Sequence, residues 1–245
     1  MSGYSYQDPR GHRALELPQP PFLPAAGAVL VLHGGRADAL TPPPLLNLPG
    51  LRMLPFARAM NHSPLFADVL VASVRYRLRG WNGHRADPVQ DTRQALKELR
   101  HAAGPLPVVL VGHSMGARAA LRAADDPQVR GVVALAPWCP PGEPTEHLAE
   151  RTIVALHDEA DRITSATNTW HYLARADAAG ARVRGIRMPH GRHAMIRDAR
   201  LWHRLTTTFT AAVLGLTPPP GSTPHSETLW SPAPLDAADI TLPGL

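Results

Sequence analysis

The pentapeptide Gly112–Gly116 reads Gly-His-Ser-Met-Gly and follows directly on an apolar run, Val108–Val111. Its two glycines would let a strand and the helix after it approach closely around a strained turn. Such a turn lifts the central Ser114 side chain above the edge of a sheet. A helix that begins near Ala117 would also direct its partly positive N-terminal end toward that side chain. These features indicate a nucleophilic serine rather than an ordinary glycine-rich turn.

A serine hydroxyl is a poor nucleophile at neutral pH, so Ser114 requires a base and an acid that orients the base. Downstream of it, carboxylates gather in the segment His157–Ile163, where Asp158, Glu159 and Asp161 compete for the acid role. The structural alternative is a helix start that is rich in acids. A metal site is not expected here, because no pair of histidines or cysteines at ligand spacing stands nearby.

Three histidines compete for the role of base. His113 adjoins Ser114, but the turn directs neighbouring side chains away from the nucleophile, so a structural role is expected for it. His190 and His193 lie between the last apolar run and the final helical pattern. The alternatives for these two are a solvated loop histidine and a His-x-x-His metal pair. The latter is the weaker hypothesis.

The elements that would position these side chains alternate between short apolar runs and helical patterns. The predicted strands are Gly27–Leu32, Asp68–Val74, Pro107–Val111, Val129–Leu135, Thr152–Leu156 and Ala181–Met188. Apolar residues at three- and four-residue steps predict helices through Val89, Leu96 and Leu99, through Ala117–Ala124, and through Met195–Val213. This alternation implies right-handed crossovers. The predicted fold class is therefore α/β, with a doubly wound, mostly parallel sheet that has helices on both faces.

Proline distinguishes the ends of the chain from its middle. We predict a Pro-rich lead-in over residues 1–26, one α/β domain over residues 27–216, and a loosely ordered tail over residues 217–245. The apolar pair Leu229 and Trp230 could dock the tail on the domain as a plug or on a partner subunit; a disordered extension is the alternative. Thr41–Pro49 is predicted to be a rigid surface loop.

The order of these features resembles the α/β-hydrolase superfamily over about residues 27–215. His33-Gly34-Gly35, after the first long strand, looks like the oxyanion loop of that superfamily. The turn Arg79–Gly83 resembles its Arg-Gly-x-Gly turn, and the serine turn, an acid loop and a late histidine follow in the family's order. The resemblance implies an α/β-hydrolase fold, which is a three-layer sandwich.

The resemblance also assigns the site. The family's acid loop reads His-Gly-x-x-Asp, which maps the acid onto Asp161, although Asp158 stands where the family has glycine. The family's histidine follows a glycine and precedes a helix, which maps the base onto His193. Catalytic residues Ser114, Asp161 and His193 are thus implied.

Two backbone N–H groups are implied as oxyanion-hole donors, those of Met115 and Gly35, with Gly34 as second choice. The family's selectivity usually comes from an inserted cap, and the segment from Ala136 to Arg151 is too short to hold one. Trp138 in that segment is the expected wall of a substrate pocket, and ordinary core packing is the alternative for it.

Composition and charge limit which classes of partner are expected for this chain. Hydrophobic residues make up 44% and charged residues 18% of the chain, which is typical of a globular protein. The net charge of +5 comes from scattered arginines, so neither nucleic acid nor a membrane is an expected partner. Cys139 is the sole cysteine, Met1–Arg13 has no signal-like apolar stretch, and no run is long enough to span a membrane. A cytoplasmic location is expected.

The sequence thus predicts a cofactor-free serine hydrolase that cleaves a small ester, thioester or amide through an acyl-enzyme. Acyl transfer and cofactor-free peroxidation are other chemistries that the fold hosts. A catalytically silent binding module is the alternative from another class of protein.

Overall fold

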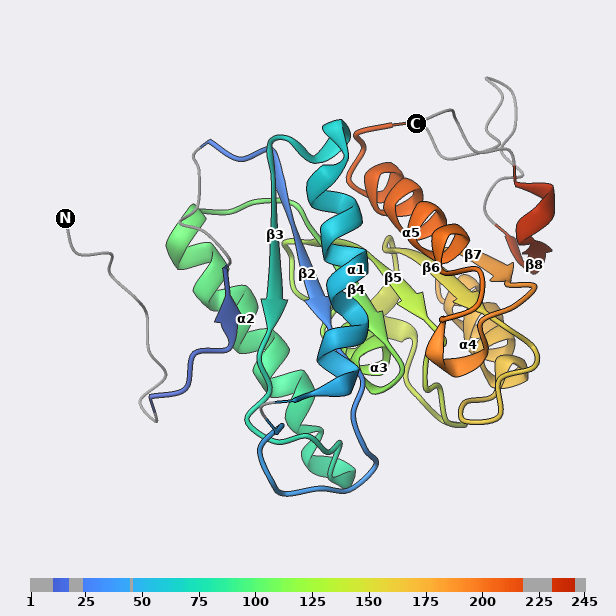
Figure 1. Cartoon of the computed structure of the whole chain (residues 1–245), viewed down its shortest axis with the longest axis horizontal. Helices are drawn as coiled ribbons and strands as arrows, with labels where there is room; N and C mark the ends of the chain where they lie inside the picture. Colours follow the sequence, from blue (N-terminus) through green and yellow to red (C-terminus); the bar gives the residue numbers. More distant parts are fainter. Residues whose placement is uncertain (1–10, 18–23, 45, 218–230, 241–245) are drawn as a thin grey trace.

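The computed structural model describes residues 11–17, 24–44, 46–217 and 231–240, which form one sheet with helices on both faces (Figure 1). Eight strands make up the sheet in this described part of the chain. Their bounds are β1 Leu15–Glu16, β2 Gly27–Leu32, β3 Val69–Val74, β4 Val108–His113, β5 Val129–Leu135, β6 Thr152–His157, β7 Arg182–Arg187 and β8 Ser231–Asp236. The spatial order is β1-β3-β2-β4-β5-β6-β7-β8, and only β1 is antiparallel to its neighbour.

This strand order determines where a ligand can reach the sheet. The chain passes from β2 outward to β3 and then returns to the other side of β2 as β4, after which the strands follow in sequence order. The order therefore reverses between β2 and β4. In doubly wound sheets, ligands bind outside the carboxyl ends of the strands at such a switch point. Ser114 directly follows β4, and His33–Gly35 directly follow β2.

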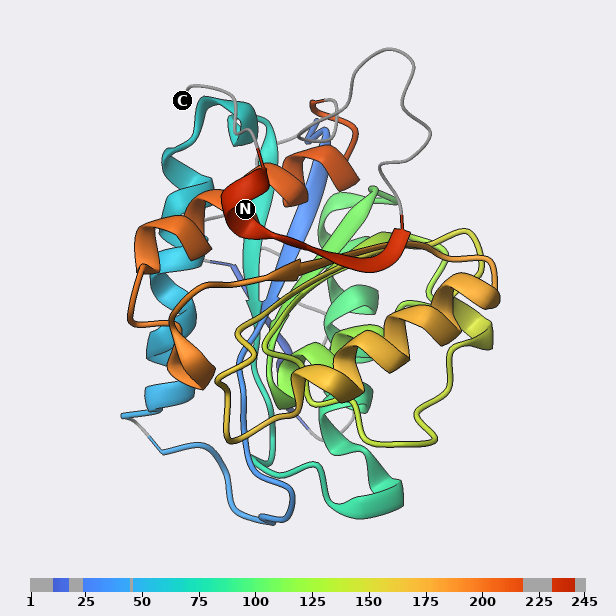
Figure 2. The same ribbon diagram turned by 90° about the vertical axis from the view of Figure 1, so that its right-hand side faces the viewer.

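The helices cover the two faces of the sheet in two groups. On one face lie α1 (Leu48–His62) and α5 (Ala199–Val213); on the other lie α2 (Asp87–Ala103), α3 (Met115–Arg122) and α4 (Ala166–Ala178), as Figure 2 shows. Alternate residues of β2 follow this division. Val29 and Val31 belong to the apolar core on the α1 side, whereas Leu30 and Leu32 belong to the core on the α3 side. The predicted doubly wound α/β sandwich is confirmed.

Helix α1 lies partly where the sequence predicts a surface loop. It begins at Leu48 with Pro49 in its first turn, a position at which proline is well tolerated. Met53, Phe56 and Met60 form its buried stripe. Exposed leucines on the same helix, Leu48, Leu51 and Leu54, and a proline inside it, Pro55, mask this stripe in the sequence.

The two ends of the chain add edge strands that the sequence does not predict. Within the lead-in, β1 pairs with β3, and Leu15 N–H donates to Glu98 Oε2 at 2.7 Å. Residues 231–236 form β8 beside β7, which differs from the predicted loosely ordered tail. Pro232 and Pro234 are compatible with a strand here, because an edge strand needs ladder hydrogen bonds on one side only. Leu229 and Trp230 lie outside the described residues.

Among the described residues, no helix is long and apolar enough to cross a membrane.

Candidate active site

Ser114 occupies a strained turn between β4 and α3. Its φ of 55° lies in the left-handed region that residues other than glycine rarely adopt. A Cβ atom on Gly112 would come within 2.6 Å of the Ala117 backbone, and one on Gly116 within 2.6 Å of the Leu32 carbonyl oxygen. Both glycines are therefore required for the close approach of strand and helix. The Ser114 N–H donates to the Leu135 carbonyl at 3.0 Å, which fixes the turn to the neighbouring strand.

His193 and Asp161 come together from two different loops at the same edge of the sheet. His193 Nδ1 donates to Asp161 Oδ2 at 2.8 Å. This bond fixes the tautomer of the ring and leaves Nε2 as the basic nitrogen. The His193 side chain is 15% exposed and the Asp161 side chain is fully buried.

His193 and Ser114 are not joined by a hydrogen bond. The His193 ring lies 4.8 Å, between centroids, from the ring of His113, which directly precedes Ser114. In the described part of the chain, no hydrogen bond joins His193 to the Ser114 hydroxyl. Catalytic hydrogen bonds are often long without substrate and tighten when it binds. His193 thus lies next to His113, the residue before Ser114, without a hydrogen bond to the serine hydroxyl.

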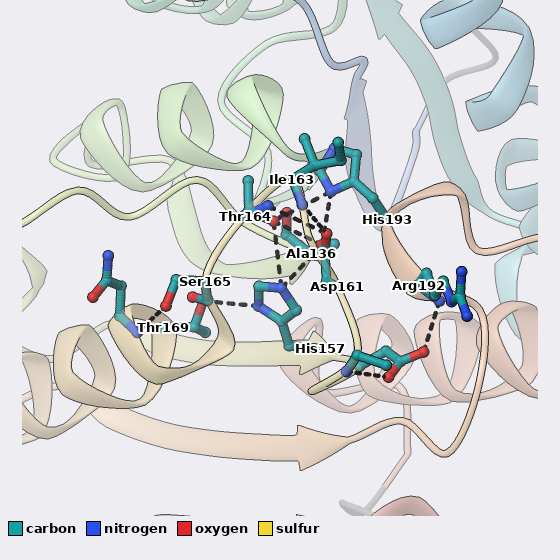
Figure 3. A network of polar contacts seen from close by, with 12 residues as sticks. Ala136, His157, Asp161, Ile163, Thr164, Ser165, Thr169, Arg192 and His193 are labelled. Atoms are coloured by element: carbon teal, nitrogen blue, oxygen red, sulfur yellow. Dashed lines mark hydrogen bonds and ion pairs between the residues drawn. The ribbon is translucent and has the colours of Figure 1, made fainter.

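Asp161 receives more hydrogen bonds than the one from His193 (Figure 3). Its Oδ2 also accepts from Thr164 Oγ1 at 2.8 Å and from His157 Nε2 at 3.2 Å. Its Oδ1 accepts from the N–H groups of Ile163 at 2.7 Å and Thr164 at 3.2 Å. Burial opposes the charged carboxylate, but these hydrogen bonds outweigh it and hold the pKa of Asp161 well below its usual range. Asp161 is therefore ionised at neutral pH.

The two competing acids have other partners. Asp158 is buried, and its Oδ2 accepts from the Arg192 N–H at 2.7 Å, which ties the acid loop to the loop that carries His193. Glu159 is exposed and forms an ion pair with Arg187 at 3.0 Å. Neither carboxylate is hydrogen-bonded to His193. The structure therefore brings Asp161, of the three candidates, to the histidine.

The other two histidines have different environments. His113 is buried, and its Nε2 donates to the His193 carbonyl at 2.9 Å. Burial, with the nearby His193 ring as a smaller cause, lowers the pKa of His113 to about 3, so its ring is neutral at neutral pH. His190 is exposed, and its carbonyl accepts from Trp202 Nε1 at 2.8 Å. Across the described residues, no group of three or more histidine, cysteine, aspartate or glutamate side chains is arranged to hold a metal ion.

Met115 and Gly35, whose N–H groups are the expected oxyanion donors, lie against each other. Met115 is the first residue of α3, so its N–H has no partner within the helix. Gly35 packs on the Met115 side chain, since a Cβ on Gly35 would lie 2.6 Å from Met115 Sδ. A Cβ on Gly34 would lie 3.4 Å from Ser114 Cβ. Within the described residues, neither the Met115 N–H nor the Gly35 N–H donates a hydrogen bond. Both can therefore donate to an oxygen atom of a ligand.

Trp138 contributes to a stacked group that the sequence does not predict. The Arg118 guanidinium carbon lies 3.8 Å from the Trp81 ring centroid and 4.4 Å from that of Trp138. Arg118 also forms an ion pair with the buried carboxylate of Glu143 at 2.7 Å. The Trp138 backbone N–H donates to the Ser114 carbonyl at 3.2 Å, so the backbone of this half-buried residue lies next to the turn that holds Ser114. Its ring contacts Arg118 and Trp81, and its expected role as the wall of a substrate pocket stays a prediction.

Comparisons with known proteins show the family and the fold of this chain. A family model described as "Alpha/beta hydrolase family" matches residues 28–244. A putative α/β hydrolase from Agrobacterium tumefaciens has a TM-score of 0.62 at 15% identity, over 86% of this chain and 96% of that one. Est1E from Butyrivibrio proteoclasticus, solved with ferulic acid bound, has a TM-score of 0.56 at 11% identity, over 82% and 95%.

A serine hydrolase without a lid from Xanthomonas campestris has a TM-score of 0.50 at 18% identity, over 82% of this chain and 85% of that one. At these identities the structural likeness shows the fold alone. No curated protein matches the chain.

Proposed function

This chain belongs to the alpha/beta hydrolase family, and we propose that it is a serine hydrolase that cleaves a small ester, thioester or amide through an acyl-enzyme. The observation that carries this proposal is the hydrogen bond between His193 Nδ1 and Asp161 Oδ2, beside a serine on a strained strand-to-helix turn. The proposed nucleophile, orienting acid and base then follow one another along the chain in the order Ser, Asp, His.

In the proposed reaction, Ser114 Oγ attacks the substrate carbonyl while His193 Nε2 takes its proton. Asp161 holds the ring in this tautomer and stabilises the imidazolium that forms. The N–H groups of Met115 and Gly35 donate to the oxygen that becomes negative. His193 then gives this proton to the leaving group. In the second half of the reaction, water attacks the acyl-enzyme while His193 takes a proton from it. His193 returns that proton to Ser114 Oγ as the acid product leaves.

Two further observations support the proposal. The low pKa of Asp161 keeps this carboxylate charged at neutral pH, as stabilisation of an imidazolium requires. The segment between β5 and β6, residues 136–151, contains only a short 3₁₀ turn, Glu146–Leu148, and is too short for a lid domain. This segment therefore holds no lid domain over Ser114.

A catalytically silent binding module is the second candidate, and the missing hydrogen bond between His193 and Ser114 Oγ favours it. Hydrolysis of p-nitrophenyl esters, with acyl chains from acetate upward, separates the two candidates. We expect turnover that disappears in the Ser114→Ala variant. Activity on every ester no greater than that of Ser114→Ala would support the silent module.

A further inference from the structure

Arg52 is a partly buried cation on helix α1. Within the described residues, its side chain takes part in no ion pair and no hydrogen bond. Its burial lowers the pKa of the guanidinium. A guanidinium stays charged at neutral pH and presents five N–H donors in a planar fork that matches a carboxylate. An anion bound at Arg52 would therefore offset the cost of burying this charge.

The part of α1 that holds Arg52 lies at the carboxyl edge of the sheet. Asn47, the residue before the helix, is hydrogen-bonded through Nδ2 to His33 Nε2 at 3.1 Å, and His33 directly follows β2. Arg52 comes five residues after Asn47 and four residues before Phe56, so it shares a face of the helix with Phe56. The Phe56 ring packs on the His203 ring of α5, with 4.5 Å between centroids, and α1 and α5 lie side by side in Figure 1. Arg52 is therefore on the α5 side of α1, at the carboxyl edge.

His113 links Arg52 to the proposed active site. Val111 of β4 belongs to the apolar core on the α1 side, and His113, two residues on, continues this alternation. The ring of His113 also lies beside that of His193, with 4.8 Å between centroids. Burial is the main cause of the low pKa of His113, and the charge of Arg52 is a smaller one. The guanidinium is therefore close enough to the residue before Ser114 to act on it electrostatically.

The loops at this edge contain further arginines that form no ion pair within the described residues. They are Arg36 after the oxyanion loop, Arg79 after β3, Arg162 after Asp161, and Arg192 before His193. Arg79 Nε is buried without a hydrogen-bond partner in the described part of the chain. Asp38 and Asp198 are exposed carboxylates of the same edge, so positive charge exceeds the negative charge that is free to oppose it. Such an excess around a site raises the local concentration of anions.

We propose that the site takes substrates that carry a carboxylate, and that Arg52 binds this group while the carbonyl to be cleaved lies at Ser114. This inference names the substrate class of the proposed hydrolase and rests on that function. A guanidinium binds a carboxylate through two parallel hydrogen bonds, which orient the substrate as well as hold it. The carboxylate can belong to the acyl group or to the leaving group.

The test compares charged with neutral substrates in wild type and three variants of α1. Arg52→Gln removes the charge, Arg52→Lys retains it, and Arg58→Gln is the matched control. Arg58 is an exposed arginine six residues farther along the same helix, away from the carboxyl edge. It also forms no ion pair within the described residues.

For the acyl arm, kcat/KM is measured on mono-p-nitrophenyl adipate and on its neutral methyl ester. For the leaving-group arm, it is measured on p-acetoxybenzoate and on p-acetoxybenzamide. In the arm that uses Arg52, the ratio of charged to neutral kcat/KM should fall about tenfold in Arg52→Gln, because a charge-assisted hydrogen bond is lost. The ratio should fall less in Arg52→Lys and stay unchanged in Arg58→Gln. In wild type it should decrease as the salt concentration is raised.

An unchanged ratio in Arg52→Gln in both arms would overturn the inference and leave the hydrolase standing. An equal decrease in Arg58→Gln would also overturn it, because the effect would then belong to the charge of the whole helix.

Binding to Ser114→Ala separates this inference from the proposed function. The four esters are titrated calorimetrically into Ser114→Ala, alone and combined with Arg52→Gln or Arg58→Gln. Tighter binding of a charged ester than of its neutral partner, lost with Arg52→Gln and kept with Arg58→Gln, would support the carboxylate site even if no ester is hydrolysed. No preference of Ser114→Ala for the charged esters would overturn it.

Discussion

His193 Nδ1 lies 2.8 Å from Asp161 Oδ2, although the two residues are 32 positions apart in the chain. They meet because β6 and β7 are parallel neighbours, so the loops after both strands leave the same edge of the sheet. Asp158 holds the two loops together, since its carboxylate accepts a hydrogen bond from the backbone N–H of Arg192. The pairing that the proposed chemistry needs is therefore built by two loops that are tied to each other.

The first prediction distinguishes the two late histidines. His193→Ala should reduce kcat on a p-nitrophenyl ester by about a thousandfold or more, because the base is removed. His190→Ala should stay within about twofold of wild type, because the His190 side chain is exposed and only its backbone carbonyl is engaged. Steady-state kinetics on both variants check this. Full activity of His193→Ala would move the base elsewhere.

The second prediction concerns the acid. Asp161→Asn should lower kcat by about a hundredfold or more, since an amide cannot stabilise an imidazolium. Glu159→Gln is the matched control, because it changes an exposed carboxylate in the same loop that pairs only with Arg187. Its kcat should match wild type. The acid assignment fails if Asp161→Asn retains wild-type kcat.

The third prediction follows from His113. Its pKa is about 3 in the folded protein, lowered mainly by burial, against about 6.5 in an unfolded chain. Between these values the unfolded state binds the additional proton, so stability is greatest above pH 6.5 and falls as the pH drops toward 3. In His113→Gln, which keeps a donor, the decrease in Tm from pH 7 to pH 4 should be smaller than in wild type. An identical decrease in both proteins would contradict this assignment.

The fourth prediction tests the close packing around the serine. Gly116→Ala should destabilise the protein by about 2 kcal/mol or more, because its Cβ would be forced against the backbone of Leu32 and His33. Denaturant unfolding measures this change. Ser114→Ala is the control in the same turn and should leave the unfolding midpoint close to wild type, since it removes only a hydroxyl. An unchanged midpoint in Gly116→Ala would mean that the strand and helix are farther apart than the structure places them.

The sequence predicts the long strands well because most of their residues are apolar on both faces, as in Gly27–Leu32. It fails for α1, where Pro55 and exposed leucines mask the buried stripe. It fails also for β8, whose prolines are typical of a disordered segment and are accommodated only because β7 offers an edge.

The candidate site divides in the same way. The turn at Ser114 can be predicted from the local sequence, since Gly112 and Gly116, which the turn requires, lie two residues before and after the serine. The hydrogen bonds of Thr164 and His157 to Asp161 carry none, because they depend on how the loop folds back on itself. The contact of Arg118 with the rings of Trp81 and Trp138 joins three separate segments and is visible only in the fold.

The most direct test of the central claim is labelling with a fluorophosphonate, followed by intact mass and peptide mapping. The account predicts one adduct per chain, on Ser114, and much slower labelling of His193→Ala, because the hydroxyl needs its base. No adduct on Ser114 in a folded protein, or equal labelling rates with and without His193, would contradict it.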